Sequence, residues 1–317
     1  MSTLHLVDPE ILPILALFDA ADITRETLAA ARVWSGKRMA AAPPPTLGPR
    51  RETVAGRAGA PDVGVLVYDP PSEDRLRPAF LHVHGGGMII GSAEMSITTA
   101  PQVALEFDAV VVSVDYRLAP ETPFPGPQED NYAALEWLVS SASTLGVDPA
   151  RIVVGGESAG GGLAAALSIM VRDRGEFALI GQVLTYPMLD HRVGGPSDPF
   201  NNPMTGEFVW TRAKNCFGWE CLRGDYELDD DRIGWYSPAR AADLSGLPPT
   251  YIATGTLDLF FDENLDYARR LSAAGVPVEL HAYPGAFHAF NALPTTRLAT
   301  QYRRDIDGAL RRFLVRS

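Results

Sequence analysis

Apolar residues gather in short runs separated by turns along most of the chain after residue 50. Seven of these runs have the length and the β-branched content of strands. They are Val63–Tyr68, Ala79–His84, Ala109–Asp115, Arg151–Gly155, Leu179–Tyr186, Thr250–Thr254 and Val278–Tyr283. The run R-I-V-V-G at Arg151–Gly155 is apolar after its first residue, which predicts a strand that is buried on both faces.

Between the predicted strands, apolar residues recur at the spacing of amphipathic helices. The helices predicted in this way are Gln128–Leu145, Leu163–Val171, Asp262–Ala274 and Leu298–Leu314. Strands that alternate with helices form a mostly parallel sheet with helices on both faces. We therefore predict the α/β class of fold.

Two regions depart from this alternation. Residues 1–40 predict two helices, Ile11–Ala21 and Thr24–Met39, and a proline-rich linker follows at Ala42–Pro49. Residues 190–235 contain several Trp and Phe residues and little strand character, which predicts a helical insertion above the sheet. The expected division is a helical part at 1–45, a first core part at 46–189, the insertion at 190–235, and a second core part at 236–317.

Composition and charge exclude several classes of function. The chain has 317 residues, of which 46% are hydrophobic and 21% charged, as in ordinary globular proteins. Its 27 Lys and Arg against 39 Asp and Glu give a net charge of −12, so it lacks the basic footprint that nucleic acid or an anionic membrane requires. The apolar stretch at Ile11–Phe18 has acidic flanks and no basic segment before it, unlike a signal peptide. We expect a cytoplasmic monomer or homodimer without a membrane partner.

The two cysteines, Cys216 and Cys221, have neither C-x-x-C spacing nor a neighbouring His. They are too few for a disulfide framework and are interpreted as packing residues, so no metal site is expected.

The segment Gly156-Glu157-Ser158-Ala159-Gly160 has the pattern G-x-S-x-G. It follows a predicted buried strand and leads into a predicted helix, which is the setting of a nucleophile elbow. Glycines are needed there because a Cβ on either flank would collide with neighbouring backbone. The elbow places Ser158 at a helix N-terminus, which favours developing negative charge. Ser158 is therefore the candidate nucleophile.

The same glycines allow a second interpretation. Gly160-x-Gly162-x-x-Ala165 fits a permissive dinucleotide fingerprint, with Asp173 as a possible ribose partner. That fingerprint should open directly from the first strand of its sheet, whereas several predicted strands precede it here. No Lys follows the glycines, so a P-loop is excluded. The elbow is the favoured interpretation.

A second glycine-rich motif, His84-Gly85-Gly86-Gly87, follows a predicted strand directly. Three glycines leave backbone N–H groups free to approach a ligand, as in an oxyanion hole, whereas a simple flexible turn needs only one. The backbone performs this role, so His84 is interpreted as structural, and His82 on the strand as a packing residue.

A serine nucleophile needs a base and an orienting acid in the order Ser, Asp or Glu, His. Three histidines follow Ser158, and His288 is preferred because it lies in a loop beyond the carboxyl end of a strand. His281 is read as a strand residue, and His191 lies at the start of the insertion. Asp258 is preferred as the acid because it is the first carboxylate after its strand, whereas Asp262 suits the first turn of the next helix.

From residue 50 to the end, these motifs resemble the bacterial hormone-sensitive-lipase family (family IV) of α/β-hydrolase esterases. The resemblance rests on four motifs in order: His84–Gly87, the D-Y-R-L-A-P-E string at Asp115–Glu121, the elbow, and an Asp and a His separated by 30 residues. It departs from the usual family pattern at Leu259-Phe260, at Ala289 and at Glu157. None of these departures removes a catalytic group.

The resemblance implies an α/β-hydrolase fold whose helical cap matches residues 1–45 and 190–235. It also implies that Gly86, Gly87 and Ala159 donate to the oxyanion, and that Asp115, Arg117 and Glu121 form an ion-pair network behind the site. The implied activity is that of a serine carboxylesterase acting on short-chain, small-molecule esters, with no metal or organic cofactor. An amidase or peptidase using the same residues, and a non-catalytic ligand-binding member of the fold, are the alternatives.

Overall fold

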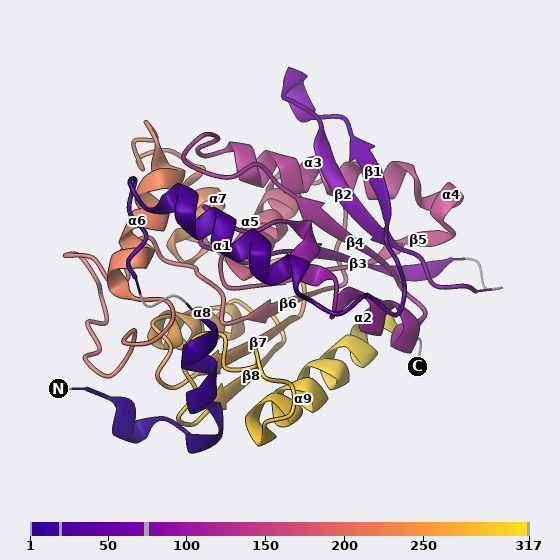
Figure 1. Cartoon of the computed structure of the whole chain (residues 1–317). Helices are drawn as coiled ribbons and strands as arrows, with labels where there is room; N and C mark the ends of the chain where they lie inside the picture. The colour runs from indigo at the N-terminus through magenta and orange to yellow at the C-terminus, as the bar shows by residue number, and fades with distance from the viewer. Residues whose placement is uncertain (1, 19–20, 73–75, 316–317) are drawn as a thin grey trace.

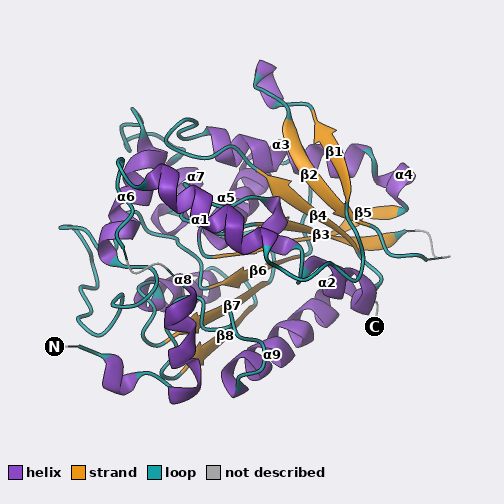
Figure 2. Ribbon diagram, in the orientation of Figure 1, coloured by secondary structure: helices purple, strands orange, loops and turns teal. Residues whose placement is uncertain are grey.

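The computed structural model describes residues 2–18, 21–72 and 76–315, which form an eight-stranded sheet with helices on both faces (Figures 1 and 2). Along the sheet the strand order is β1-β2-β4-β3-β5-β6-β7-β8. Strands β3 to β8 run parallel to one another, and β2 is antiparallel to both of its neighbours. The strands are β1 Arg50–Val54, β2 Val63–Tyr68, β3 Arg77–Val83, β4 Val110–Asp115, β5 Val147–Glu157, β6 Gly181–Thr185, β7 Thr250–Gly255 and β8 Val278–Tyr283.

Helices cover the sheet in two layers, with α2 and α9 on one face and α3, α5 and α8 on the other. Alternation along β3 explains both layers, because Leu81 and Val83 belong to one apolar cluster and Phe80 to the other. The α-helices are α1 Leu28–Ala40, α2 Ala100–Phe107, α3 Gly126–Ser140, α4 Ala142–Leu145, α5 Ala159–Arg174, α6 Arg212–Arg223, α7 Ile233–Tyr236, α8 Phe261–Ala273 and α9 Arg297–Leu314. Short 3₁₀ helices lie at Leu4–Leu6, Pro9–Leu17, Arg57–Gly59, Ala93–Ser96 and Pro238–Arg240.

The predicted α/β alternation is confirmed, and all seven predicted strands are present. Strand β1 and helix α2 lie in segments for which no element was predicted, as do the 3₁₀ helices at Arg57–Gly59, Ala93–Ser96 and Pro238–Arg240. Strand β1 has the sequence R-R-E-T-V and lies at the end of the sheet, mostly exposed, so it has no apolar run to reveal it. Helix α2 has only eight residues, too few for a clear helical period. The helix predicted at Gln128–Leu145 is divided into α3 and α4.

The N-terminal region differs from its prediction. The α-helix expected at Ile11–Ala21 is instead a 3₁₀ helix at Pro9–Leu17, and residues 19 and 20 of the expected range lie outside the described residues. Pro13 lies within this helix and has no N–H to donate to an α-helical ladder. Tertiary packing holds the segment, because Ile11 and Ile14 are completely buried.

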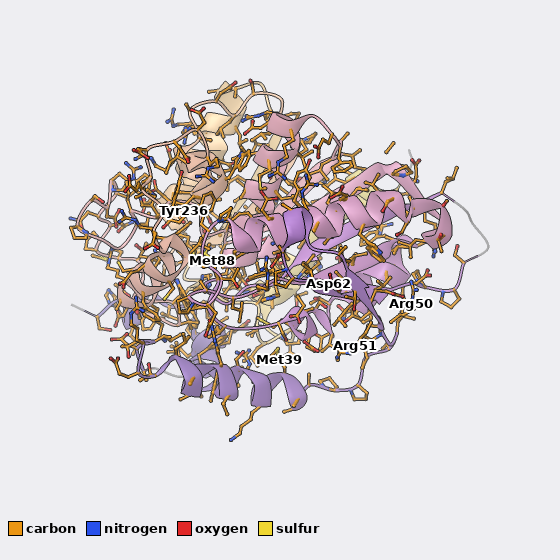
Figure 3. All side chains as sticks on the ribbon, turned by 90° about the horizontal axis from the view of Figure 1, so that it is seen from above. Met39, Arg50, Arg51, Asp62, Met88 and Tyr236 are labelled. Atoms are coloured by element: carbon orange, nitrogen blue, oxygen red, sulfur yellow. The ribbon has the colours of Figure 1, made fainter. Side chains whose placement is uncertain are left out.

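The predicted insertion contains helix α6, and α7 extends one residue past its expected end. Tyr236, labelled in Figure 3, lies at the end of α7. Its hydroxyl donates to the Trp219 carbonyl of α6 over 3.0 Å, which joins the two helices. The N-terminal region reaches the same helix through an exposed ion pair between Arg25 and Glu220 at 3.2 Å.

Candidate active site

Ser158 lies in a sharp turn between the end of β5 and the start of α5. Its backbone has φ 58° and ψ −122°, a conformation that ordinary residues rarely adopt. A Cβ at Gly156 or Gly160 would lie 2.2 or 2.0 Å from the Val83 carbonyl oxygen, so neither glycine can be replaced without moving backbone. The predicted strand–turn–helix is present, and its glycines have the predicted steric reason.

The structure brings Ser158, His288 and Asp258 into one hydrogen-bonded row. His288 Nε2 lies 2.9 Å from Ser158 Oγ, and His288 Nδ1 lies 2.8 Å from Asp258 Oδ2. The other oxygen of Asp258 accepts the Phe260 N–H over 3.0 Å, which fixes the carboxylate. Because this carboxylate accepts a hydrogen bond from Nδ1–H, Nε2 carries no proton and is left to accept the serine proton. All three residues are buried, with Asp258 only 1% exposed.

The competing residues have other partners. Asp262, in the first turn of α8, accepts from the side-chain amide of Asn202 over 2.8 Å. His281 lies in β8 and pairs with Glu279 at 2.7 Å. His191 packs against Trp219 and Tyr236, and burial lowers its pKa to about 4.

Aromatic rings surround His288, and motif reasoning alone did not predict this enclosure. The ring of Tyr186 lies 4.7 Å from the imidazole, that of Phe260 at 5.3 Å and that of Trp210 at 6.3 Å, measured between centroids. Phe260 gave a sequence signal as a departure from the family pattern, and Trp210 as one of the aromatic residues of the predicted insertion. An apolar surround strengthens electrostatic interactions within the row and limits the access of water.

The glycine motif after β3 forms a loop beside Ser158. A Cβ at Gly85 would lie 3.4 Å from the Ser158 Cβ. Gly86 and Gly87 have φ of 112° and 61°, and a Cβ on Gly87 would lie 2.1 Å from the Trp210 ring. Within the described residues, the N–H groups of Gly86, Gly87 and Ala159 have no hydrogen-bond partner. These donors are therefore available to an oxygen held near Ser158.

His84 has the structural role that was expected of it. It is completely buried, stacks on the Tyr116 ring at 4.1 Å, and its carbonyl accepts the Tyr116 hydroxyl over 3.0 Å. Burial lowers the pKa of His84 to about 4, so the imidazole is neutral at pH 7.

Two other interpretations require correction. His82 is more than a packing residue, since its Nε2 lies 3.0 Å from Glu157 Oε2 and its Nδ1 lies 3.0 Å from Ser113 Oγ. The residues next to His82 in the sequence are apolar and do not indicate these partners. Both partners lie on strands that neighbour β3 in the sheet.

The ion-pair network expected among Asp115, Arg117 and Glu121 is wrong. The segment Asp115–Glu121 leaves the sheet at the end of β4, so its side chains point toward different elements. Arg117 pairs with Asp130 of α3 at 2.6 Å, Glu121 pairs with Arg32 of α1 at 2.7 Å, and Asp115 accepts the Ala93 N–H over 3.0 Å.

The glycines of the possible nucleotide-binding fingerprint pack against other parts of the protein. A Cβ on Gly162 would lie 2.0 Å from the Met188 carbonyl oxygen, so Gly162 permits the close approach of α5 to the segment after β6. Asp173, the candidate ribose partner, accepts from Arg172 and from the Trp235 ring nitrogen.

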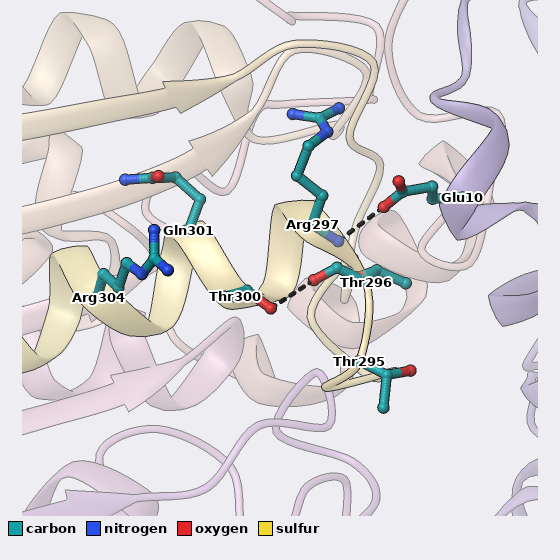
Figure 4. Close-up of a pocket in the computed structure, with 7 residues that line it drawn as sticks. All are labelled: Glu10, Thr295, Thr296, Arg297, Thr300, Gln301 and Arg304. Carbon is teal, nitrogen blue, oxygen red and sulfur yellow. Dashed lines mark hydrogen bonds between the residues drawn. The ribbon is translucent and has the colours of Figure 1, made fainter.

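Several features of the described residues lie away from Ser158. Among the described residues, no group of three or more His, Cys, Asp or Glu could hold a metal ion, and Cys216 and Cys221 are free. No helix in this part of the chain is long and apolar enough to cross a bilayer. A surface hollow of about 500 Å³ lies at the start of α9, where Glu10 already accepts the Arg297 N–H over 2.7 Å (Figure 4).

The fold and this geometry define an α/β hydrolase. A family model described as the alpha/beta hydrolase fold matches residues 80–292, more than half of the chain. The chain belongs to this family, and the resemblance to hormone-sensitive-lipase-type esterases is confirmed.

Individual relatives specify the activity. The chain is 34% identical to carboxylesterase NlhH of Mycobacterium tuberculosis over 301 residues, which cover 89% of each chain. It is 31% identical to ethyl acetate hydrolase of Pseudomonas putida over 75% of this chain and 78% of that one. The solved structure of a bacterial heroin esterase superposes with a TM-score of 0.90 and 37% identity over the whole of both chains. The protein is a carboxylesterase.

Proposed function

We propose that the enzyme hydrolyses short-chain carboxylic esters, with Ser158 as nucleophile, His288 as general base and acid, and Asp258 as the orienting acid. The observation that carries this proposal is the row of contacts from Ser158 Oγ to His288 and on to Asp258, at 2.9 and 2.8 Å. A nucleophile bonded to a base, with that base held by a buried carboxylate, is the arrangement that activates a serine.

In the first half of the reaction, His288 Nε2 takes the Ser158 proton as Oγ bonds to the ester carbonyl carbon. The carbonyl electron pair moves to oxygen, and the resulting oxyanion accepts hydrogen bonds from Gly86, Gly87 and Ala159 N–H groups. When the intermediate collapses, the C–O bond to the alcohol breaks and His288 returns the proton to the leaving oxygen. Water then repeats the sequence on the acyl-enzyme and releases the carboxylic acid.

The proposed substrates are small, water-soluble esters with acyl chains of about two to eight carbons. Two segments support this size limit, residues 1–45 and 190–235, which we propose act as a cap over the site. Trp210 from the second segment packs directly on the glycine loop at Gly87. Arg32 from α1 donates to the carbonyls of Ile89 and Ala119 at the far side of the same loop, over 2.8 and 2.9 Å. The relative named ethyl acetate hydrolase is consistent with a short acyl group.

The test is Ser158→Ala, assayed with p-nitrophenyl acetate and by labelling with a fluorophosphonate. Loss of a serine nucleophile lowers kcat by about 10⁶-fold, and the label should no longer attach. Ser168→Ala is the matched control, because Ser168 is equally buried on α5 but donates to the Ala164 carbonyl. Turnover near the wild-type rate in folded Ser158→Ala would refute the assignment.

A further inference from the structure

Three polar side chains form a hydrogen-bonded chain across the sheet, and the proposed reaction uses none of them. They are Glu157 on β5, His82 on β3 and Ser113 on β4, joined by contacts of 3.0 Å on each side of the imidazole. These strands are neighbours in the order β4-β3-β5. His82 is 4% exposed and Ser113 is completely buried, so the imidazole is held at both nitrogens within the protein.

The chain lies where the two halves of the active site leave the sheet. Glu157 is the residue before Ser158, and His82 stands two residues before His84, where the glycine loop begins. The paired register between β3 and β5 ends at Val83 and Gly156. Beyond that pair, no further β3–β5 backbone pairing holds the two segments together, although both must supply groups to the same reacting carbonyl.

Contacts at this point are close enough for the side-chain pair to govern the spacing. A Cβ on Gly85 would lie 2.9 Å from the Glu157 carbonyl oxygen, so the glycine loop lies directly against the backbone of the elbow. A buried imidazole with partners on both nitrogens has one ring orientation, because any rotation would leave a buried polar atom unpaired. The Glu157–His82 contact is therefore a stiff link between the strand with the nucleophile and the strand with the oxyanion loop.

We propose that Glu157 and His82 are positioning residues that set the separation between Ser158 Oγ and the N–H groups of Gly86 and Gly87. The inference rests on the proposed function, in which those groups act as nucleophile and oxyanion donors. The ester ground state makes little use of this separation, and the tetrahedral intermediate depends on it. Loss of the link should lower kcat and leave KM nearly unchanged.

The experiment compares Glu157→Ala with Glu157→Gln. A glutamine oxygen can still accept from His82 Nε2–H, whereas alanine cannot. A misplacement of about 1 Å costs up to about 100-fold in rate, so we expect kcat to fall 10- to 100-fold in Glu157→Ala and to stay within about 3-fold of wild type in Glu157→Gln. Glu157 is partly exposed, with 32% of its side chain accessible, so both variants are expected to fold.

A second readout separates positioning from a general loss of stability. A short-chain trifluoromethyl ketone adds Ser158 Oγ to its carbonyl carbon, passes the serine proton to His288 and leaves an oxyanion on the former carbonyl oxygen. Its inhibition constant should rise in Glu157→Ala by the same factor as kcat falls. Glu279→Ala is the matched control, because it breaks another Glu–His contact, 2.7 Å long, on the edge strand β8.

The possible results distinguish failure of the inference from failure of the proposed function. Glu157→Ala with normal kcat, or with low kcat but unchanged ketone affinity, would overturn the inference. Equal losses in Glu157→Ala and Glu157→Gln would also overturn it, because charge rather than the hydrogen bond would then be responsible. If Ser158→Ala is inactive while Glu157→Ala behaves as wild type, only the inference fails. If Ser158→Ala is active, the proposed function itself fails.

Discussion

Two histidines seven residues apart each contact a carboxylate, yet their surroundings differ completely. The His288 and Asp258 side chains are 6% and 0% exposed, and the second imidazole nitrogen faces a serine hydroxyl. His281 and Glu279 are 30% and 34% exposed, and the second nitrogen of His281 faces another carboxylate, Asp305, at 3.4 Å. A His–carboxylate contact therefore does not by itself define a catalytic pair. Enclosure and a serine hydroxyl on the opposite nitrogen are what distinguish the first pair.

Removal of each histidine in turn should separate the two pairs most strongly. Loss of the base of a serine triad costs about as much as loss of the whole triad, about 10⁶-fold in kcat. We expect His288→Ala to show that loss and His281→Ala to keep kcat within a few-fold of wild type. Steady-state kinetics on p-nitrophenyl acetate measures both. Comparable losses in the two variants would refute the distinction.

Replacement of each carboxylate should separate the two pairs by a smaller loss of kcat. Replacing the orienting Asp by Asn leaves the imidazole in the wrong tautomer and costs about 10⁴-fold in kcat. Asp258→Asn should therefore lose about 10⁴-fold, whereas Asp262→Asn and Glu279→Gln should lose little. Asp262 is the demanding control, because it lies only four residues away and bonds to Asn202. A larger loss in Asp262→Asn than in Asp258→Asn would show that Asp262, and not Asp258, is the orienting acid.

Enclosure of the His288 pair predicts a limit on substrate length. Each methylene that fits an apolar pocket contributes up to about 0.8 kcal/mol, or roughly 4-fold in kcat/KM, and each further one meets a wall. The specificity constant for p-nitrophenyl esters should rise with chain length up to about eight carbons and then fall steeply. A maximum at twelve carbons or more, or a jump in rate once the substrate forms an emulsion, would contradict the short-chain proposal.

A third histidine, His84, should make the free energy of unfolding depend on pH. The pKa of buried His84 is about 4 in the folded protein, whereas an unfolded histidine titrates near 6.5. Below pH 6.5 the unfolded chain takes up a proton that the folded chain refuses, so the free energy of unfolding falls as the pH drops toward 4. From pH 7 to pH 5 the fall due to His84 is about 2 kcal/mol.

Urea unfolding at the two pH values measures this change, and His84→Gln should remove that part of it. An identical pH dependence in His84→Gln and in the wild type would show that His84 does not titrate as its burial requires.

Sequence patterns predicted the structural elements that depend on residues close together in the sequence. They missed the contacts between residues that are far apart in the sequence. The strand, turn and helix around Ser158 could be predicted because glycine placement and apolar runs are local. The 3₁₀ helix at Pro9–Leu17 could not, because the packing of Ile11 and Ile14 overrides local helix propensity. Arg117 was given the wrong partner because its true partner, Asp130, becomes adjacent only when α3 folds against the sheet.

The same limit applies around the site. Chain order and strand ends were sufficient to choose His288 and Asp258 from their competitors, and the structure brings these two together with Ser158. The aromatic enclosure and the contact between His82 and Glu157 come from separate strands and the insertion, and no spacing in the sequence records them.

The contact between Gly87 and Trp210 makes their evolution interdependent. No side chain can be added at Gly87 while the Trp210 ring lies 2.1 Å from the position of its Cβ, and the left-handed backbone there further disfavours one. A smaller residue at position 210 would have to come first, and it would remove the ring that packs on the glycine loop before a side chain at position 87 could fill the space. The order of substitutions therefore matters, so variation at these two positions is more accessible to libraries that change both at once than to stepwise mutation.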